Sequence, residues 1–239
     1  MSAQVEPVPV VSLEKVSKIF NGSGIGTTAV WEASLDAYPG ELLLLLGPSG
    51  SGKTTLLTLA AGLCRPTTGR VRLFGRDIGR YSAVELQRLR AGRIGFIFQN
   101  FLLLDSLTAE ENVAMVLRFN GCRGGDRRRR ALALLQEAGV GALARRFPRT
   151  MSQGERQRVA VARAMANTPE LVLADEPTGS LETSQGLDII GLLRRQAGER
   201  KACVLVASHD LRLIEAADRV FRLEDGRIRT LSPSSGRRD

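Results

Sequence analysis

The sequence predicts an α/β fold built on a largely parallel sheet, and three observations support this class. Continuous apolar segments, which are typical of strands buried on both faces, occupy residues 42–46, 171–174 and 203–207. A segment with helical periodicity follows each of them. A glycine-rich turn, residues 47–54, joins the first strand to its helix. We therefore expect crossover connections, parallel strands and a ligand site at the carboxyl edge of the sheet.

The turn reads Gly-Pro-Ser-Gly-Ser-Gly-Lys-Thr and fits the phosphate-binding pattern G-x-x-x-x-G-K-[ST]. Glycines allow successive backbone N–H groups to turn inward, because a Cβ there would obstruct a phosphate. The N-terminus of the following helix adds partial positive charge. Lys53 is expected to reach the β- and γ-phosphates and Thr54 to bind Mg²⁺. The predicted nucleotide-binding residues are Gly47, Pro48, Ser49, Gly50, Ser51, Gly52, Lys53, Thr54 and Thr55.

Further strands and helices flank this turn. Residues 10–16 alternate in polarity and are expected to form an edge strand, and residues 30–37 form a second strand after a glycine-bearing loop. The other elements expected before residue 100 are helices at residues 54–61 and 82–90 and strands at residues 70–74 and 93–98, the last of which ends at Gln99.

Residues 101–166 differ from the segments before them, because helices follow one another without a strand. Helical periodicity covers residues 108–119 and 127–138, and a glycine-bearing loop separates the two. A third helix, residues 152–166, begins with the capping box Ser152-x-x-Glu155. We predict a helical lobe, about residues 101–166, inserted into the α/β core.

After this lobe the chain returns to alternating strands and helices. The expected elements are strands at residues 171–174 and 203–207, helices at residues 187–195 and 211–217, and a hairpin of residues 220–223 and 227–230 joined across Asp225-Gly226. The polar tail, residues 232–239, is expected to be disordered. The prediction is one domain over residues 1–239, with its core in residues 10–100 and 167–231.

Two adjacent carboxylates, Asp175 and Glu176, end the apolar strand at residues 171–174. They should reach the same sheet edge as the glycine-rich turn. Asp175 then suits a magnesium shell, and Glu176 suits orienting or deprotonating an attacking water. The alternative is a solvated strand end without a chemical role.

The chain is basic, with a net charge of +9. Such a balance suits nucleic acid, an acidic membrane surface or an acidic partner. Aromatic residues make up only 5% of the chain, whereas a single-stranded nucleic-acid groove needs stacking aromatics, so we expect no nucleic-acid partner. The arginine run at residues 127–130 is expected to be a solvated helix face, and anionic lipid or a membrane subunit is its alternative partner.

Cysteine usage and hydropathy bound the location of the chain. Cys64, Cys122 and Cys203 are an odd number without a C-x-x-C pair, so neither a disulfide framework nor a zinc site is expected, and a reducing cytoplasm fits. Residues 1–10 lack the features of a signal peptide, and no apolar run is long enough to predict a membrane-spanning segment.

A further motif, Met-Ser-Gln-Gly-Glu at residues 151–155, precedes Arg-Gln-Arg-Val-Ala-Val-Ala-Arg-Ala. With the two nucleotide motifs, it makes the chain resemble the ATP-binding subunits of ABC transporters over about residues 13–228. The resemblance implies that the end of this helix binds the γ-phosphate held by an opposite subunit, through Ser152, Gln153, Gly154 and Glu155. Gln153 stands where that family usually has glycine, and Glu182 where it usually has aspartate.

The same resemblance implies roles for isolated residues. Gln99 would contact the metal and the attacking water, and His209, the only histidine, would contact the γ-phosphate. Phe20 would stack on adenine at a position where the family commonly has tyrosine. The alternatives are a strand-end glutamine and a histidine without chemical roles, and a phenylalanine that belongs to the core or a loop.

Finer resemblance extends to the lipoprotein-release and macrolide-export branch. It rests on Gln-Asn-Phe-Leu-Leu-Leu at residues 99–104, on Leu-Thr-x-x-Glu-Asn-Val at residues 107–113 and on residues 171–179, although Asp105 replaces the usual proline. The resemblance implies an ATPase that closes head to tail with a second copy on two ATP. Its other partners would be separate membrane permease subunits and, through them, a periplasmic adaptor.

The implied location is the cytoplasmic face of the inner membrane. Two alternatives stay open at this stage: the ATPase of an ABC importer, and a non-transport ABC ATPase that serves as a nucleotide-dependent binding module.

Overall fold

The computed structural model describes residues 8–21, 26–179 and 181–231. The predicted disordered tail, residues 232–239, and residues 22–25 of the predicted glycine-bearing loop lie outside these ranges.

The described strands are β1 (Val11–Phe20), β2 (Thr27–Ala37), β3 (Leu42–Leu46), β4 (Thr68–Leu73), β5 (Arg76–Asp77), β6 (Ile94–Ile97), β7 (Leu171–Asp175), β8 (Cys203–Ser208), β9 (Arg219–Glu224) and β10 (Arg227–Leu231). The α-helices are α1 (Lys53–Ala60), α2 (Ala83–Arg93), α3 (Ala109–Phe119), α4 (Gly124–Glu137), α5 (Gln153–Ala164) and α6 (Thr183–Arg200). Short 3₁₀ helices are η1 (Ile78–Arg80), η2 (Gly141–Leu143), η3 (Pro148–Thr150) and η4 (Leu211–Ala216).

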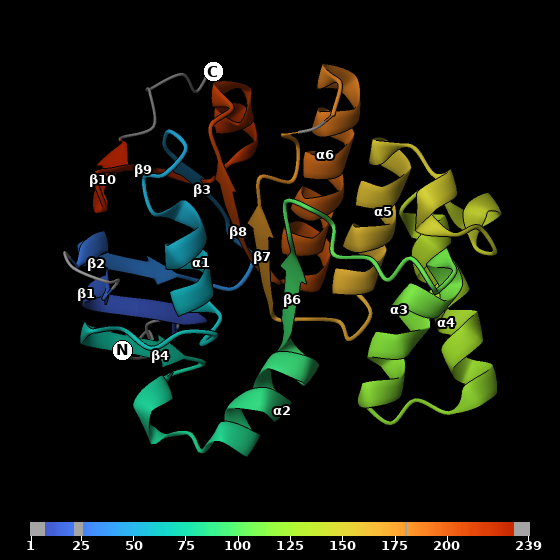
Figure 1. The fold of residues 1–239 in the computed structure, drawn as a ribbon, viewed down its shortest axis with the longest axis horizontal. Helices are drawn as coiled ribbons and strands as arrows, with labels where there is room; N and C mark the ends of the chain where they lie inside the picture. Colours follow the sequence, from blue (N-terminus) through green and yellow to red (C-terminus); the bar gives the residue numbers. More distant parts are fainter. Residues whose placement is uncertain (1–7, 22–25, 180, 232–239) are drawn as a thin grey trace, which may run out of the picture.

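A six-stranded sheet with the order β10-β9-β3-β8-β7-β6 forms the centre of the molecule. Its strands are parallel except β10, which pairs antiparallel with β9 as the predicted hairpin. Every residue of β3, β7 and β8 is buried, because helices cover both faces of the sheet (Figure 1). The carboxyl ends of β3, β6, β7 and β8 therefore meet at one edge, where their following loops lie together.

A second, antiparallel sheet has the order β2-β1-β4-β5. β1 is not the edge strand that the sequence predicted, because Val11 faces both Ala37 of β2 and Leu73 of β4. An alternating pattern reports which face of a strand is buried and carries no information about a second neighbour. Leu57 of α1 is fully buried in a cluster that joins this sheet to the six-stranded one, so α1 fills the space between the two sheets.

The helices α3, α4 and α5 lie side by side on the opposite side of the six-stranded sheet from α1 (Figure 1). Val113, Leu135 and Val159 share one buried cluster with Val172 and Val206 of the sheet. α4 begins at Gly124, inside the segment predicted as a loop. Glycine disfavours a helix by about 1 kcal/mol, and the tertiary contacts of α4 outweigh this preference.

Two other predictions differ from the structure at the C-terminal side. α6 is longer at both ends than the predicted residues 187–195, and the predicted helix at residues 211–217 is the 3₁₀ helix η4. The three cysteines are unpaired. No helix in the described ranges combines the length and the hydropathy that crossing a membrane requires.

Candidate nucleotide site

The glycine-rich turn between β3 and α1 is pressed against neighbouring backbone. A Cβ at Gly47 would lie 2.3 Å from the carbonyl oxygen of Leu223, and one at Gly52 would lie 2.1 Å from that of Ala29. Gly52 also has a φ of 101°, which side chains rarely adopt. These two positions therefore require glycine, which fixes the turn against β9 and β2.

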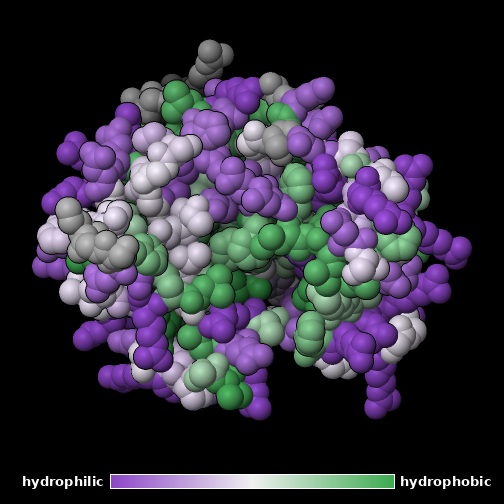
Figure 2. Space-filling model, in the orientation of Figure 1, coloured by the Kyte–Doolittle hydropathy of each residue, from purple (hydrophilic) through white to green (hydrophobic). Residues whose placement is uncertain are grey.

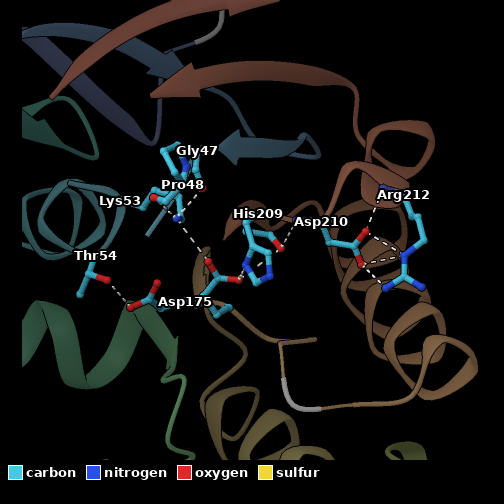
Figure 3. A network of polar contacts seen from close by, with 10 residues as sticks. Gly47, Pro48, Lys53, Thr54, Asp175, His209, Asp210 and Arg212 are labelled. Atoms are coloured by element: carbon cyan, nitrogen blue, oxygen red, sulfur yellow. Dashed lines mark hydrogen bonds and ion pairs between the residues drawn. The ribbon is translucent and has the colours of Figure 1, made fainter. Parts of the chain in front are cut away.

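Lys53 opens α1, and its buried amine reaches back across the turn (Figure 3). Its Nζ donates to the carbonyl oxygens of Gly47 at 2.7 Å and Pro48 at 2.9 Å. The same Nζ forms an ion pair with Oε1 of Glu176 at 3.3 Å, and both side chains are more than nine-tenths buried. The Lys53 ammonium is thus held at the turn by neutral oxygens and one carboxylate.

Asp175 ends β7 beside the first turn of α1. The hydroxyl of Thr54 donates to its Oδ2 at 2.7 Å, although the two residues are 121 positions apart (Figure 3). Its Oδ1 is buried without a hydrogen-bond partner among the described residues. Burial raises the pKa of Asp175; the hydrogen bond from Thr54 opposes this rise, the charge of Glu176 adds to it, and that of Lys53 opposes it.

Glu176 follows in a left-handed backbone conformation, with a φ of 47°. Its Oε2 lies 2.9 Å from Nδ1 of His209 and accepts a hydrogen bond from the hydroxyl of Ser208 at 3.4 Å. Ser208 was not predicted as a site residue, and its only sequence signal is its place at the end of a buried strand. His209 itself is 60% exposed, so its ring remains open to a ligand.

One pocket of about 320 Å³ at the carboxyl edge of the six-stranded sheet is lined by Lys53, Asp175, Glu176 and His209. The pocket also includes Gln99, so the structure brings together the predicted catalytic and metal-binding side chains. The segment 27–29 of β2, which the sequence analysis did not select, forms part of the wall. The lining residues are Thr27, Thr28, Ala29, Ser49, Gly50, Gly52, Lys53, Thr54, Thr55, Gln99, Asp175, Glu176 and His209.

Phe20 is not among the lining residues of this pocket. It ends β1, is 48% exposed, and faces Thr27, which does line the pocket. Its ring lies 5.1 Å from Nζ of Lys18. The predicted stacking residue therefore lies next to the pocket, on the strand that pairs with the lining residue Thr27.

The segment 152–155 is also absent from the lining of the pocket. Ser152 caps α5, and the predicted capping box is present: its Oγ accepts from the Glu155 N–H at 3.3 Å, while Oε2 of Glu155 accepts from the Ser152 N–H at 2.7 Å. Gln153 is exposed. The structure thus leaves this helix end outside the pocket of its own chain.

Two other positions from the sequence analysis, Glu182 and the arginine run at residues 127–130, lie on exposed or partly exposed surface. Glu182 is the N-cap residue of α6 and makes no side-chain cap hydrogen bond. In the arginine run, Arg128 pairs with Glu110 at 2.9 Å and Arg129 with Asp126 at 2.8 Å. The four residues of these two ion pairs are exposed or partly exposed, as expected for a solvated helix face.

The model of the ABC transporter family matches residues 30–179. The chain belongs to this family, and it is an ATP-binding cassette of the ABC ATPase class. The predicted fold class and the predicted family are confirmed.

Similar proteins narrow the family. Over 220 residues the chain is 40% identical to the lipoprotein-releasing system ATP-binding protein LolD 2 of Caulobacter vibrioides, covering 92% of this chain and 96% of that one. Over 222 residues it is 39% identical to the macrolide export ATP-binding/permease protein MacB of Rhodospirillum rubrum, covering 93% of this chain. The chain spans only 34% of the length of that macrolide export relative.

A solved structure is similar throughout. It is the dimeric, post-hydrolysis state of an ATP-binding cassette bound to ADP and Pi, with a TM-score of 0.89 and 36% identity. The match covers 94% of this chain and 99% of that one. The likeness therefore extends over nearly the whole fold described above.

Proposed function

We propose that the chain is the ATP-hydrolysing subunit of an export-type ABC transporter, which closes head to tail as a homodimer on two ATP and drives separate permease subunits. One observation carries this proposal. The pocket gathers Lys53, Asp175, Glu176 and His209 from distant parts of the chain, yet the capped end of α5 at Ser152 is not part of it. A site divided in this way is completed by a second copy.

ATP binds with its phosphates in the glycine-rich turn. The Lys53 ammonium already lies at this turn, where it donates to two carbonyl oxygens. Phosphate oxygens are stronger acceptors than carbonyls, so the ammonium exchanges these bonds for charge-assisted ones when ATP enters. The backbone N–H groups of the turn and of the first turn of α1 supply the remaining donors.

Residues of the pocket fit Mg²⁺ when phosphate oxygens complete the ligand set. The described residues contain no cluster of three or more His, Cys, Asp or Glu side chains suited to a metal by itself. Asp175, however, has one buried oxygen without a partner and a second that accepts from Thr54. Thr54, Asp175 and Gln99 would hold the ion, which when bound neutralises charge on the phosphates.

Glu176 orients and deprotonates the attacking water. Its carboxylate pairs with Lys53, a contact that a triphosphate replaces. The carboxylate then keeps its contacts to Ser208 and His209 and turns its other oxygen to the water. His209, largely exposed beside it, contacts the γ-phosphate and stabilises the charge that develops there.

The second copy supplies the α5 end. Ser152, Gln153, Gly154 and Glu155 form a capped helix N-terminus, which favours an anion through its N–H groups and its dipole. The dimeric state of the similar ADP-bound cassette supports this arrangement. Phe20 of each copy stacks on the adenine of the ATP in its own pocket.

An apolar groove between α2 and α3 is the proposed docking site of the permease. Val84, Val116 and Phe119 line it, and Phe119 is 76% exposed. Figure 2 shows hydrophobic side chains on both sides of a hollow in the lower part of the molecule. The relative named as a macrolide export ATP-binding/permease protein joins a permease to its cassette in one chain, which supports this occupant.

The location and the movement follow from this docking. Residues 101–166 form the helical lobe that turns against the core, residues 10–100 and 167–231, when ATP closes the dimer. The subunit lies on the cytoplasmic face of the inner membrane, bound to its permease, which in turn contacts a periplasmic adaptor.

Replacing Glu176 by Gln tests the enzymatic part. The variant should bind ATP normally and release phosphate about a hundredfold or more slowly, because the amide cannot accept the proton of the water. Phosphate release and ATP binding are measured side by side. A variant that hydrolyses at the normal rate would remove Glu176 from this role.

Affinity purification from detergent extracts tests the transport part. Recovery of a polytopic membrane protein supports the permease partner, whereas recovery of ribosomes or DNA favours a nucleotide-dependent binding module. Transport assays with the recovered permease then separate an exporter from an importer by the direction of movement.

A further inference from the structure

The segment that follows Gln99 contains two consecutive residues in the left-handed backbone conformation. Phe101 has a φ of 59° and Leu102 a φ of 48°. Residues with a Cβ rarely adopt this conformation, and two in succession are unfavourable unless other contacts hold them. Neither position is a glycine. The Phe101 N–H donates to the Phe98 carbonyl oxygen at 3.0 Å and the Leu102 N–H to that of Asn100 at 2.5 Å, while the carbonyl groups of Phe101 and Leu102 take further contacts from elsewhere in the fold.

Arg163, in the last turn of α5, provides these contacts. Its Nη2 donates to the carbonyl oxygen of Phe101 at 2.7 Å, and its Nη1 donates to that of Leu102. Arg163 and Phe101 are 62 positions apart in the chain. A guanidinium presents its donors in a rigid planar fork, so one side chain fixes both carbonyl directions together.

The surroundings of Arg163 are unusual for a charged residue. Among the described residues no carboxylate pairs with its guanidinium, which donates to the two carbonyl oxygens. Burial lowers the pKa of Arg163. Arg163 is partly exposed, and the hydrogen bonds of its guanidinium both go to the bend at Phe101 and Leu102.

A second contact joins the same helix to the same bend. The guanidinium carbon of Arg156 lies 5.4 Å from the centre of the Phe101 ring. Farther along, the fully buried Asn112 of α3 accepts from the Leu104 N–H at 2.8 Å and donates to the Leu104 carbonyl oxygen at 3.1 Å. The helical lobe therefore contacts the segment after Gln99 at two places, first at Phe101 and Leu102 and then at Leu104.

Arg163 is connected to three parts of the proposed transporter subunit, which are the capped end of α5, the apolar groove and Gln99. The capped end of α5 at Ser152 is 11 residues from Arg163, so about 16 Å of rigid helix joins the two. Arg163 also lines a small cavity with Leu102 and Val116, and Val116 belongs to the apolar groove as well. The third part is Gln99, which lines the nucleotide pocket.

We propose that Arg163 is a positioning residue: by holding Phe101 and Leu102 in the left-handed conformation it sets the place of Gln99 in the nucleotide pocket. A movement of α5, or a partner that binds in the groove, then changes the place of Gln99 through the guanidinium of Arg163. The inference rests on the proposed function, because the place of Gln99 affects catalysis only if the chain hydrolyses ATP. Arg163 itself does not line the nucleotide pocket and acts through Gln99.

Arg163→Lys is the principal variant. Lysine keeps the charge but offers a single flexible donor group, which cannot hold two carbonyls in a fixed geometry. We expect kcat to fall about tenfold while KM for ATP changes less than about twofold, because the glycine-rich turn is untouched. The matched control is Arg158→Lys on the same helix, since Arg158 contacts the Ala138 carbonyl and Asp188 instead. This control should keep the rate of the unaltered chain.

A double-mutant cycle decides whether Arg163 acts through Gln99. Gln99→Ala alone slows hydrolysis, and adding Arg163→Lys should then cost nothing further. If the two losses multiply instead, Arg163 serves general stability and the proposal is overturned. An Arg163→Lys variant with a normal kcat overturns it as well.

Hydrogen exchange provides a readout that does not depend on hydrolysis. The amides of residues 101–104 should exchange faster in Arg163→Lys, while those of residues 47–54 stay unchanged. In the Glu176→Gln protein, where Arg163 is intact, adding ATP should change exchange at residues 101–104. Constant exchange there contradicts the proposal even if Arg163→Lys does not fold. A chain that hydrolyses no ATP would overturn the proposed function, and the exchange result would still decide the role of Arg163.

Discussion

The two parts of the proposed composite site differ in the contacts that each makes within its own chain. In the pocket, Lys53, Asp175 and Glu176 are buried and already joined to neighbours by short polar contacts. The α5 end is exposed, and Ser152 contacts only the first turn of its own helix. This difference fits the proposal that the phosphate pocket is formed within one chain, whereas the α5 end acts on a nucleotide bound by a second copy.

Loss of Lys53 should give the largest effect on the pocket side. Lys53→Met removes the phosphate donor and leaves the buried Glu176 carboxylate without its cation. We expect the Kd for ATP to rise about 100-fold or more, which corresponds to about 3 kcal/mol. Lys15→Met, on β1 and outside the pocket, is the control. Calorimetric titration with ATP measures both, and a Kd within twofold of the unaltered value would break the comparison.

Whether water reaches the buried strands of the six-stranded sheet can be tested at Cys203, at the start of β8. Burial, with a contribution from the charge of Glu41, raises the pKa of Cys203 to about 12, partly opposed by Arg219. An unfolded thiol has a pKa of about 8.5. As pH rises from that value to about 12, only the unfolded chain loses the proton, so stability falls.

At pH 10 this loss should amount to about 2 kcal/mol relative to neutral pH. Urea unfolding at both pH values measures it, and Cys203→Ala should lack this part of the pH dependence. Equal pH dependence in both proteins would show that β8 admits water near Cys203.

Ser152→Ala sharpens the comparison from the other side. It removes a helix cap, which costs about 1 kcal/mol of stability. Ser82→Ala is a closely matched control, because Ser82 caps α2 with the same capping box to Glu85. Only Ser152→Ala should also lower ATPase activity, by about tenfold, because it removes a phosphate contact in the second copy.

Equal ATPase rates for the two cap variants would place the α5 end outside the nucleotide site. Analytical ultracentrifugation with ATP adds a second measure, since only Ser152→Ala should weaken the dimer.

Phe20→Leu should give the smallest effect. Leucine keeps an apolar contact but loses the stacking face, so we expect KM for ATP to rise about fivefold with kcat unchanged. Binding of inorganic triphosphate, which has no base, should not change. If triphosphate binding weakens equally, Phe20 supports the strand β1 and does not contact adenine.

Much of the pocket could be predicted, because its parts are contiguous motifs that follow parallel strands. The carboxyl ends of such strands lie at one edge of the sheet. The turn at residues 47–54, the pair Asp175 and Glu176, and His209 each follow a buried strand, so their strands deliver them to one edge. The ion pair between Lys53 and Glu176 depends on side-chain geometry across that edge, which no pattern in the sequence records.

Other features lay beyond sequence reasoning for physical reasons. The left-handed bend is carried by Phe101 and Leu102, whereas sequence patterns for such a bend depend on glycine or asparagine. Arg163 lies within a basic helical segment, and only the fold shows that its guanidinium binds carbonyls 61 and 62 positions away. The start of α4 at Gly124 and the central place of β1 are likewise set by tertiary neighbours.

The trapped dimer tests the central claim most directly. Glu176→Gln protein saturated with ATP is crystallised, and the distance from Ser152 Oγ of one copy to the γ-phosphate bound by the glycine-rich turn of the other is measured. The account predicts a hydrogen bond of about 3 Å at both sites. A monomer, or a dimer in which each Ser152 lies far from the other copy's γ-phosphate, would contradict it.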